Sequence, residues 1–300
     1  MAAHMSATIA PRIDEDLAVR RRAFEDRLEA LLPSAGHERD LVVLAMREGA
    51  LAPGKRLRPL LLILATEGLG GPAQAALDLG CAVEMVHAAS LVLDDMPCMD
   101  NAQLRRGRAT VHLAFGEDVA ILAAVALLSR AFGVVAAIDA VPAEVRTQLV
   151  ASLATAIGNR GLVQGQFEDL HQGKTPRSAG EIAATNGLKT GALFSAVLDM
   201  ACLISSARGE VCHLLNQFAD ELGQAFQLYD DLRDYDPASG KDQGKDDGKS
   251  TLVSLCGEAK VCERLQRHLA QAEACLSRAI APDDMLARFI QGMFSKALKP

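Results

Sequence analysis

The sequence predicts an all-α protein built as a single helical bundle, and three observations support this fold class. Half of the 300 residues are hydrophobic but only 4% are aromatic, and such an aliphatic composition favours helices packed on helices over packed sheets. No segment shows the alternation of apolar and polar residues that is typical of a half-buried strand. No linker divides the chain, so we expect one domain of about ten or more helices at residues 13–300, preceded by a flexible N-terminus at residues 1–12.

The expected helices follow one another along the chain. The first covers residues 13–32, where four apolar residues recur on one face: Leu17, Phe24, Leu28 and Leu31. A buried helix then follows the basic sequence GKRLRP, which begins at Gly54. The apolar pattern predicts further helices at residues 73–95, 117–139, 144–170, 181–206 and 210–235. Residues 236–250 are polar and rich in glycine, and helices resume beyond them.

Charge and apolar run length limit the partners of the protein. A net charge of −7 argues against general affinity for nucleic acid or an anionic membrane. The longest uninterrupted apolar run, Val119 to Leu128, is shorter than the roughly 20 residues that cross a bilayer, so we expect no membrane span. The seven cysteines lack the spacing of a zinc site and are interpreted as reduced thiols of a cytoplasmic protein.

Two aspartate-rich segments lie on apolar stretches that are expected to be helical. The first, LVLDDMPCMDNAQLRRG, contains Asp94, Asp95 and Asp100, and the second, FQLYDDLRD, contains Asp230, Asp231 and Asp234. Clustered carboxylates on apolar elements need a partner that offsets their desolvation and mutual repulsion. Mg²⁺ does so with one or two carboxylates per ion, and it leaves coordination sites for phosphate. Either segment alone fits a solvated helix end, but together they favour a metal site for a phosphorylated substrate.

Helical geometry predicts how each acidic segment is arranged. Asp230 and Asp234 lie about 40° apart around a helix, with Gln227 on the same face. Asp94 and Asp100 diverge by roughly 120° on an ideal helix. Because Pro97 lacks an N–H and clashes with the preceding turn, we expect the helix to end or bulge there, which lets Asp100 turn back towards Asp94.

Basic residues complete a site for more than one diphosphate, since arginine forks and lysine ammonium groups both bind phosphate oxygens. They are Lys55, Arg56, Arg58, Arg105, Arg106, Lys189, Lys241, Lys245 and Lys249. His87 falls within about 20° of Asp94 on the long helix. It is either a phosphate ligand or a satisfied interior histidine, and we favour the ligand role.

On these residues the chain resembles a trans-prenyl diphosphate synthase, and most closely the bacterial geranylgeranyl diphosphate synthases of the carotenoid pathway. The resemblance runs from Leu41 to Leu255. It depends on six segments: APGKRLRPLL, DDMPCMDNAQLRRG, LVQGQFEDL, LKTGALFSA, GQAFQLYDDLRD and GKDQGKDDGKSTLV. It implies the isoprenoid synthase fold, with a central active-site cavity in the bundle.

The resemblance also implies the roles of individual residues. Three Mg²⁺ ions are expected on Asp94, Asp100, Asp230 and Asp234, with Asp95 and Asp231 in support. Matches to the site of the allylic diphosphate are Arg105, Lys189, Gln227, Lys241 and Lys249, with Thr190 beside them. Matches to the site of isopentenyl diphosphate are Lys55, Arg58, His87 and Arg106. Gln166 and Asp169 match a motif near the reacting centre. The expected catalytic set is Asp94, Asp95, Asp100, Arg105, Lys189, Asp230, Asp231 and Lys241.

The implied reaction is ionisation of an allylic diphosphate, attack by the isopentenyl double bond and loss of a proton. Small residues below the first motif, Val86, Ala89 and Ser90, are expected to set product length and to leave room for a geranylgeranyl chain. Alternatives are a farnesyl or geranylfarnesyl diphosphate synthase, a terpene cyclase, or a non-catalytic subunit of the same fold. The resemblance further implies a homodimer.

Overall fold

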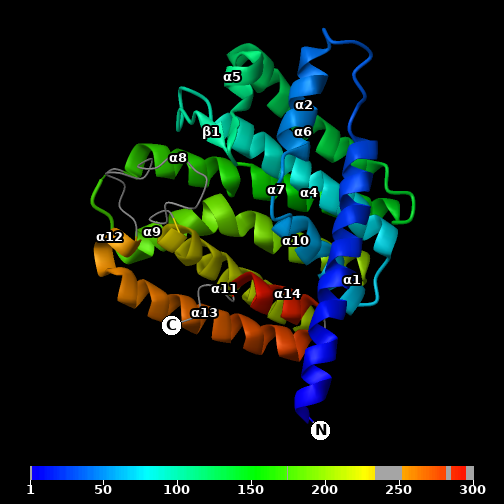
Figure 1. Ribbon diagram of the computed structural model, residues 1–300, viewed down its shortest axis with the longest axis vertical. Helices are drawn as coiled ribbons and strands as arrows, with labels where there is room; N and C mark the ends of the chain where they lie inside the picture. The colour runs from blue at the N-terminus through cyan, green and yellow to red at the C-terminus, as the bar shows by residue number, and fades with distance from the viewer. Residues whose placement is uncertain (1, 174, 234–251, 282–284, 295–300) are drawn as a thin grey trace.

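The computed structural model describes residues 2–173, 175–233, 252–281 and 285–294, and over these residues it confirms the predicted all-α class (Figure 1). The helical elements are α1 (Ala2–Leu31), α2 (Leu41–Leu51), α3 (Leu57–Gly68), α4 (Ala73–Asp94), α5 (Val111–Phe115), α6 (Glu117–Ala136), α7 (Ala143–Ile157), α8 (Leu162–Gln172), α9 (Ala179–Asn186), the π-helical η1 (Gly187–Gly191), α10 (Ala192–Ile204), α11 (Glu210–Arg233), α12 (Leu252–Cys256), α13 (Glu258–Ala279) and α14 (Met285–Phe294). Two short strands, β1 (Leu104–Arg105) and β2 (Arg108–Ala109), form a hairpin.

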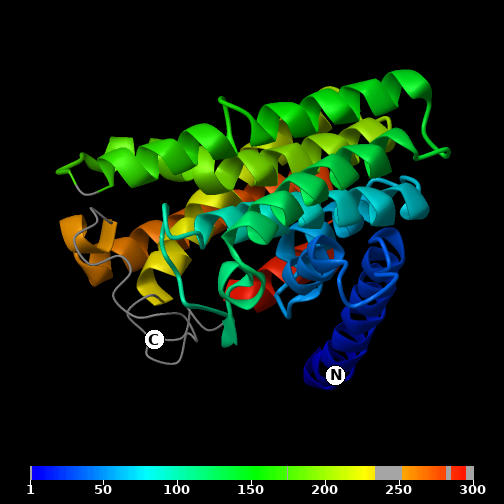
Figure 2. The same ribbon diagram turned by 90° about the horizontal axis from the view of Figure 1, so that it is seen from above.

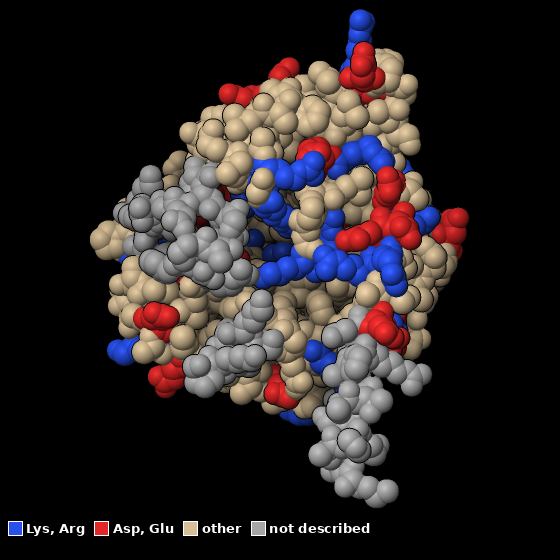
Figure 3. Space-filling model, viewed as in Figure 1, with Lys and Arg blue, Asp and Glu red and all other residues tan. Residues whose placement is uncertain are grey.

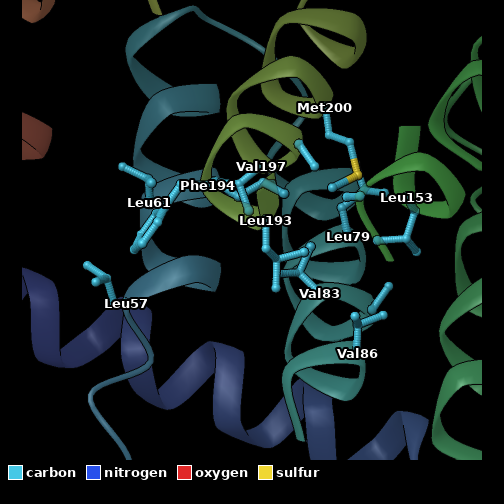
Figure 4. Close-up of a cluster of buried hydrophobic side chains, with 14 of the residues drawn as sticks. Leu57, Leu61, Leu79, Val83, Val86, Leu153, Leu193, Phe194, Val197 and Met200 are labelled. Carbon is cyan, nitrogen blue, oxygen red and sulfur yellow. The ribbon is translucent and has the colours of Figure 1, made fainter. Parts of the chain in front are cut away.

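Helix α4 lies in the centre of the bundle, packed against α3, α6 and α10. Its residues are apolar on nearly every side, which is typical of a helix enclosed by others. Figure 4 shows Leu79, Val83 and Val86 of α4 on the side that faces Leu193 and Val197 of α10. These side chains are buried, so the middle of α4 belongs to the hydrophobic core. The C-terminal end of α4 carries the first residue of the acidic segment, Asp94.

The other elements enclose this centre. Helices α7 and α8, drawn in green, form one edge of the molecule when it is seen from above (Figure 2). On the opposite side of α10, helix α11 packs along α13. The long helices run past one another so that the C-terminal ends of α4 and α11, which carry the acidic segments, are brought into the same region of the bundle.

Several helix boundaries differ from the predicted ones. The single helix expected at residues 144–170 is interrupted between α7 and α8. The turn there requires glycine at position 161, where a Cβ atom would lie 2.0 Å from the carbonyl oxygen of Ala156. The helix expected at 181–206 contains the π-helical turn η1. Helix α1 begins at Ala2, within the segment expected to be a flexible N-terminus. Helices α2 and α5 were not among the predicted elements.

The hairpin was not predicted either, since two-residue strands are too short to show a period of two. Leu104 pairs with Ala109 and Arg105 with Arg108. The two turn residues between them, Arg106 and Gly107, have φ angles of 55° and 77°. Positive φ at both positions is what a type I′ turn requires. The two neighbouring arginines of the first motif, Arg105 and Arg106, therefore lie in β1 and in this turn.

Three helical segments are long and apolar enough to cross a membrane by length and composition: Ala73–Asp94, Glu117–Ala136 and Ala179–Ile204. Uninterrupted runs understated this property, because single polar or charged residues such as Glu84 and Arg130 break a run while the mean hydropathy of the helix stays high. The first and last segments are mainly buried in the bundle, at 72% and 61% of the window. In contrast, only 39% of the α6 window is buried, and Ile121, Leu122 and Val125 are exposed on its surface.

Candidate active site

The first acidic segment begins where α4 ends. Asp94 is the last residue of the helix, and the backbone N–H of Asp100 donates to the carbonyl oxygen of Asp94 at 3.0 Å. The helix therefore ends just before Pro97, as predicted, and the chain turns Asp100 back towards Asp94. Burial raises the pKa of Asp94, and the neighbouring Asp100 acts in the same direction while Lys189 opposes both. A carboxylate in this position favours a cationic partner.

Asp95 is held by an arginine of the hairpin. The Nε of Arg105 donates to the two carboxylate oxygens of Asp95 at 3.0 and 3.3 Å, and Nη2 also donates to Oδ1. Although burial opposes its charge, the hydrogen bonds that Arg105 donates to Asp95 raise the pKa of Arg105. Thr110 and His112 brace the same segment, because the hydroxyl of Thr110 donates to the carbonyl of Ala102 at 2.9 Å and lies 3.0 Å from His112 Nδ1.

Helix α8 and η1 bring a second layer of polar groups to Asp94. Gln166 donates a hydrogen bond to Oδ1 of Asp94. The ammonium of Lys189 lies 2.8 Å from Asp169 and 4.0 Å from Asp94. A Cβ atom at Gly165 would lie 2.3 Å from the backbone nitrogen of Lys189, so the absence of a side chain there permits this approach. π-Helical turns occur frequently at functional sites, and this one presents Lys189 to the first motif.

The next residue of η1 reaches the second motif. The hydroxyl of Thr190 donates to Oε1 of Gln227 at 3.1 Å, and Nε2 of Gln227 donates to Oδ1 of Asp231 at 2.8 Å. Consecutive residues of one turn thus contact both acidic segments, which places the segments around a common space. Asp230 lies on the same helix and its charge acts on Arg58. Asp234, Lys241, Lys245 and Lys249 lie outside the residues that the structure describes.

Within the described ranges, no three carboxylate, histidine or cysteine side chains converge closely enough to hold a metal ion by themselves. Mg²⁺ is commonly bound through one or two carboxylates together with substrate phosphates and water. The donor set is of the right kind, since Asp94, Asp100 and Asp230 are all oxygen donors that are only partly covered. The residues present are therefore suited to the ion that the acidic segments predict.

The basic residues gather beside the acidic ones. Nη1 of Arg106 donates to the carbonyl oxygens of Pro53 at 2.7 Å and Ala52 at 3.4 Å, which fixes the hairpin against the loop that carries Lys55. A Cβ atom at Gly54 would lie 2.3 Å from the same Nη1, so the guanidinium of Arg106 occupies the space that a side chain at position 54 would take. Figure 3 shows Lys and Arg side chains on both sides of a hollow in this face of the molecule.

His87 belongs to the same group. Burial, and then the charges of Arg58, Arg106, Arg105 and Arg56 in that order, lower the pKa of His87 well below its usual range. The electrostatic effect of these arginines locates His87 among the cations predicted to bind isopentenyl diphosphate. A neutral imidazole in this place can donate one hydrogen bond to a phosphate oxygen.

Aromatic rings support two of the cations, a feature that the sequence analysis missed. The ammonium of Lys55 lies 5.3 Å from the ring centroid of Tyr229, and the guanidinium carbon of Arg58 lies 4.8 Å from that of Phe194. The ring of Phe226 packs on that of Phe194 with centroids 5.5 Å apart. A signal was present, because a chain with no Trp, two Tyr and nine Phe places several of its few rings inside the motifs.

A buried ion pair holds the loop of Lys55 to helix α4. Nη1 of Arg56 lies 2.5 Å from Oε1 of Glu84, and the two side chains are 3% and 4% exposed. The same Nη1 donates to the carbonyl oxygen of Ala50 at 3.1 Å. Glu84 precedes His87 by less than one helical turn, so the pair connects the loop of Lys55 and the start of α3, which carries Arg58, to the helix of His87.

The residues predicted to set product length lie along α4 below the first motif. Val86 and Ala89 are fully buried, and the hydroxyl of Ser90 donates to the carbonyl oxygen of His87 at 2.8 Å. Val86 faces the side chains of α10 and α7 in the apolar cluster of Figure 4. Their effect on product length stays a prediction.

These features define an all-α protein with a site for phosphorylated substrates, in which two aspartate segments face a group of cations. Comparison with known proteins gives the family. The polyprenyl synthetase family matches residues 40–280, and the chain belongs to this family. The resemblance to prenyl diphosphate synthases is thereby confirmed.

Three relatives show the range of similarity. A geranylgeranyl diphosphate synthase of Pantoea ananas is 55% identical over 277 residues, which cover 92% of this chain and 91% of the relative. A farnesyl diphosphate synthase of Geobacillus stearothermophilus is 39% identical over 78% of this chain and 82% of the relative. The crystal structure of an FPP/GFPP synthase from Zymomonas mobilis superposes with a TM-score of 0.84 at 34% identity, over 95% of this chain and 99% of that chain.

Proposed function

We propose that this chain is a geranylgeranyl diphosphate synthase that condenses isopentenyl diphosphate with allylic diphosphates up to farnesyl diphosphate. The observation that carries the proposal is the link through Lys189 and Thr190, which contact the first and the second acidic segment respectively. The names of the relatives from Pantoea ananas and Pseudescherichia vulneris, at 55% and 48% identity, support the twenty-carbon product.

The side chains of the site form two groups, one for each substrate. Asp94, Asp100, Asp230 and Asp234 would hold Mg²⁺, which stabilises the departing diphosphate and so promotes ionisation of the allylic carbon–oxygen bond. Arg105 and Lys189 bind the same diphosphate from the hairpin and from η1, with Lys241 and Lys249 expected to complete its charge balance. Lys55, Arg58, His87 and Arg106 orient isopentenyl diphosphate so that its double bond faces the allylic cation. No side chain serves as a nucleophile, and the released diphosphate accepts the proton.

A product assay tests the proposal. Purified protein is given isopentenyl diphosphate and Mg²⁺ with dimethylallyl, geranyl or farnesyl diphosphate, and the products are sized by mass. The expected end product is the twenty-carbon diphosphate from each starter. A farnesyl or geranylfarnesyl end product, which the likeness to the Zymomonas mobilis FPP/GFPP synthase makes the second candidate, would retain the chemistry and change the specificity. No elongation with any starter would favour the non-catalytic subunit.

Replacing Ala89 by Phe is expected to shorten the main product to fifteen carbons. Ala89 is fully buried on α4, between the acidic segment and the apolar cluster around Val86, so a ring there would occupy the space that a longer tail needs. Each methylene of the tail that remains buried contributes about 0.8 kcal/mol, and blocking it removes that contribution. The measurement is the product distribution from geranyl diphosphate, with Ala88→Phe as the control. An unchanged product would show that Ala89 does not determine the length of the product.

We further propose that the protein is a cytoplasmic homodimer, with the exposed apolar face of α6 as part of the interface. Ile121, Leu122 and Val125 are 45%, 54% and 54% exposed, and a second copy would remove them from water. Replacing Val125 by Asp is expected to shift the mass found by analytical ultracentrifugation from dimer to monomer. A monomeric wild-type protein at micromolar concentration would contradict this assignment.

A further inference from the structure

The C-terminal helix α14 ends against the predicted site for isopentenyl diphosphate. Leu286, Ile290 and Phe294 are buried at successive turns, and they form the face by which α14 packs into the bundle. The helix contacts α3, which contains Arg58 and follows directly after the loop of Lys55. Helix α14 therefore packs beside the predicted site for isopentenyl diphosphate, although it contains none of the sequence motifs.

Two aromatic rings in edge-to-face contact make the connection. The ring of Phe294, which is 1% exposed, meets the ring of Tyr229 with centroids 5.4 Å apart and planes at 71°. Tyr229 is itself 6% exposed, and it precedes Asp230 of the second acidic segment. Edge-to-face packing of this kind is favourable and fixes the orientation of both rings. The ring of Tyr229 then lies 5.3 Å from the ammonium of Lys55.

We propose that α14 positions Lys55 for isopentenyl diphosphate through the rings of Phe294 and Tyr229, an inference that rests on the proposed function. An aromatic face attracts an ammonium group, so the ring of Tyr229 holds the ammonium of Lys55 at a defined position beside the second acidic segment. A fixed ring also restricts a flexible lysine side chain, which otherwise loses rotamer freedom when the substrate binds. Phe294 and Tyr229 are thus positioning residues, and Lys55 is the residue that touches substrate.

The test compares two variants at position 229. Tyr229→Phe and Tyr229→Leu both lack the hydroxyl, so their difference isolates the ring. The KM for isopentenyl diphosphate is expected to be about three- to fivefold higher in Tyr229→Leu than in Tyr229→Phe. The KM for the allylic diphosphate and kcat are expected to stay equal in the two variants. Equal KM values for isopentenyl diphosphate, or parallel changes in both KM values and kcat, would overturn the proposal.

Phe294→Leu tests the contribution of α14. It is expected to raise the KM for isopentenyl diphosphate by about twofold in the wild-type background and to have no further effect in Tyr229→Leu, since the two rings act in series. The matched control is Phe24→Leu, which removes a fully buried ring from α1. That variant is expected to lower Tm without changing the ratio of the two KM values. A Phe294→Leu effect that persists in Tyr229→Leu would show that α14 acts by another route.

Lys55→Gln separates failure of this inference from failure of the proposed function. If Lys55→Gln raises the KM for isopentenyl diphosphate and the ring variants do not, the site is correct and the role of α14 is wrong. If Lys55→Gln leaves that KM unchanged, the assignment of Lys55 to this substrate is wrong and the inference falls with it. The expected result is a large increase in KM for Lys55→Gln and no additional effect of Tyr229→Leu in that background.

Discussion

Asp94→Ala is expected to lower kcat by about a thousandfold at saturating Mg²⁺, because it removes a carboxylate that acts on the charge developing in the transition state. Asp94 is the point at which three elements meet: α4 ends there, Gln166 of α8 donates to it, and Lys189 of η1 lies 4.0 Å away. Its loss leaves Lys189 with Asp169 as its neighbouring carboxylate. The measurement is steady-state elongation of farnesyl diphosphate over a range of Mg²⁺ concentrations.

Two controls make the result specific. Asp94→Asn keeps the size of the side chain, and its amide oxygen can accept the hydrogen bond that Gln166 donates. A loss of kcat similar to that of Asp94→Ala would therefore attribute the effect to the charge of Asp94. Asp139→Ala removes an exposed aspartate that follows α6 and is expected to retain normal activity. Near-normal turnover of Asp94→Ala would contradict the assignment of Asp94 as a metal ligand and would leave Asp100 and Asp230 as the candidate ligands.

Features encoded by local sequence were predictable. Pro97 predicted the end of α4, since a proline cannot continue the hydrogen-bond ladder, and the return of Asp100 to Asp94 follows from that break. The spacing of charged residues identified both acidic segments and the basic groups that the structure brings beside them. Apolar periodicity located α11, because a long helix with one buried face repeats the signal several times. The long apolar stretches of α4 and α6 located these two helices.

Features that depend on close approach of distant segments were not predictable. The π-helical turn at η1 does not alter apolar periodicity, yet it determines that Lys189 and Thr190 reach different motifs. The gap between α7 and α8 depends on how Gly161 meets the backbone of Ala156. Likewise, the ring of Tyr229 supports Lys55 only because α3, α11 and α14 pack together, and no pattern within one helix contains that information.

The site concentrates charge that burial opposes. Desolvation raises the pKa values of Asp94 and Asp95 and lowers those of His87 and Arg58. Each shift favours the neutral form, and each would be offset by a ligand of opposite charge. Burying these charged groups lowers the stability of the fold, while their arrangement suits a cation that bridges to a diphosphate. Residues that stabilise the site without touching substrate are therefore important for the stability of the protein.

Glu84→Leu is expected to lower the free energy of unfolding by about 3–5 kcal/mol, the usual cost of breaking a buried ion pair on one side. The substitution leaves the guanidinium of Arg56 in the interior, with the carbonyl of Ala50 as its hydrogen-bond acceptor and the half-exposed carboxylate of Glu25 at 3.8 Å as a weaker partner. Arginine cannot shed its charge at neutral pH, so the penalty is not relieved by deprotonation. Denaturant unfolding followed by circular dichroism gives the free energy, and Tm gives an independent check.

Arg56→Met is expected to cost less than Glu84→Leu, because a carboxylate left behind can be neutralised by a proton whereas a guanidinium cannot. The double variant, Arg56→Met with Glu84→Leu, is expected to be more stable than Glu84→Leu alone, since apolar replacement of both partners removes the buried charge altogether. A positive coupling of this sign would identify Arg56 and Glu84 as one unit that ties the loop of Lys55 to helix α4. Additive losses would mean that the two residues stabilise the fold independently, and that the geometry of the cationic site depends on other contacts such as that of Arg106 with Pro53.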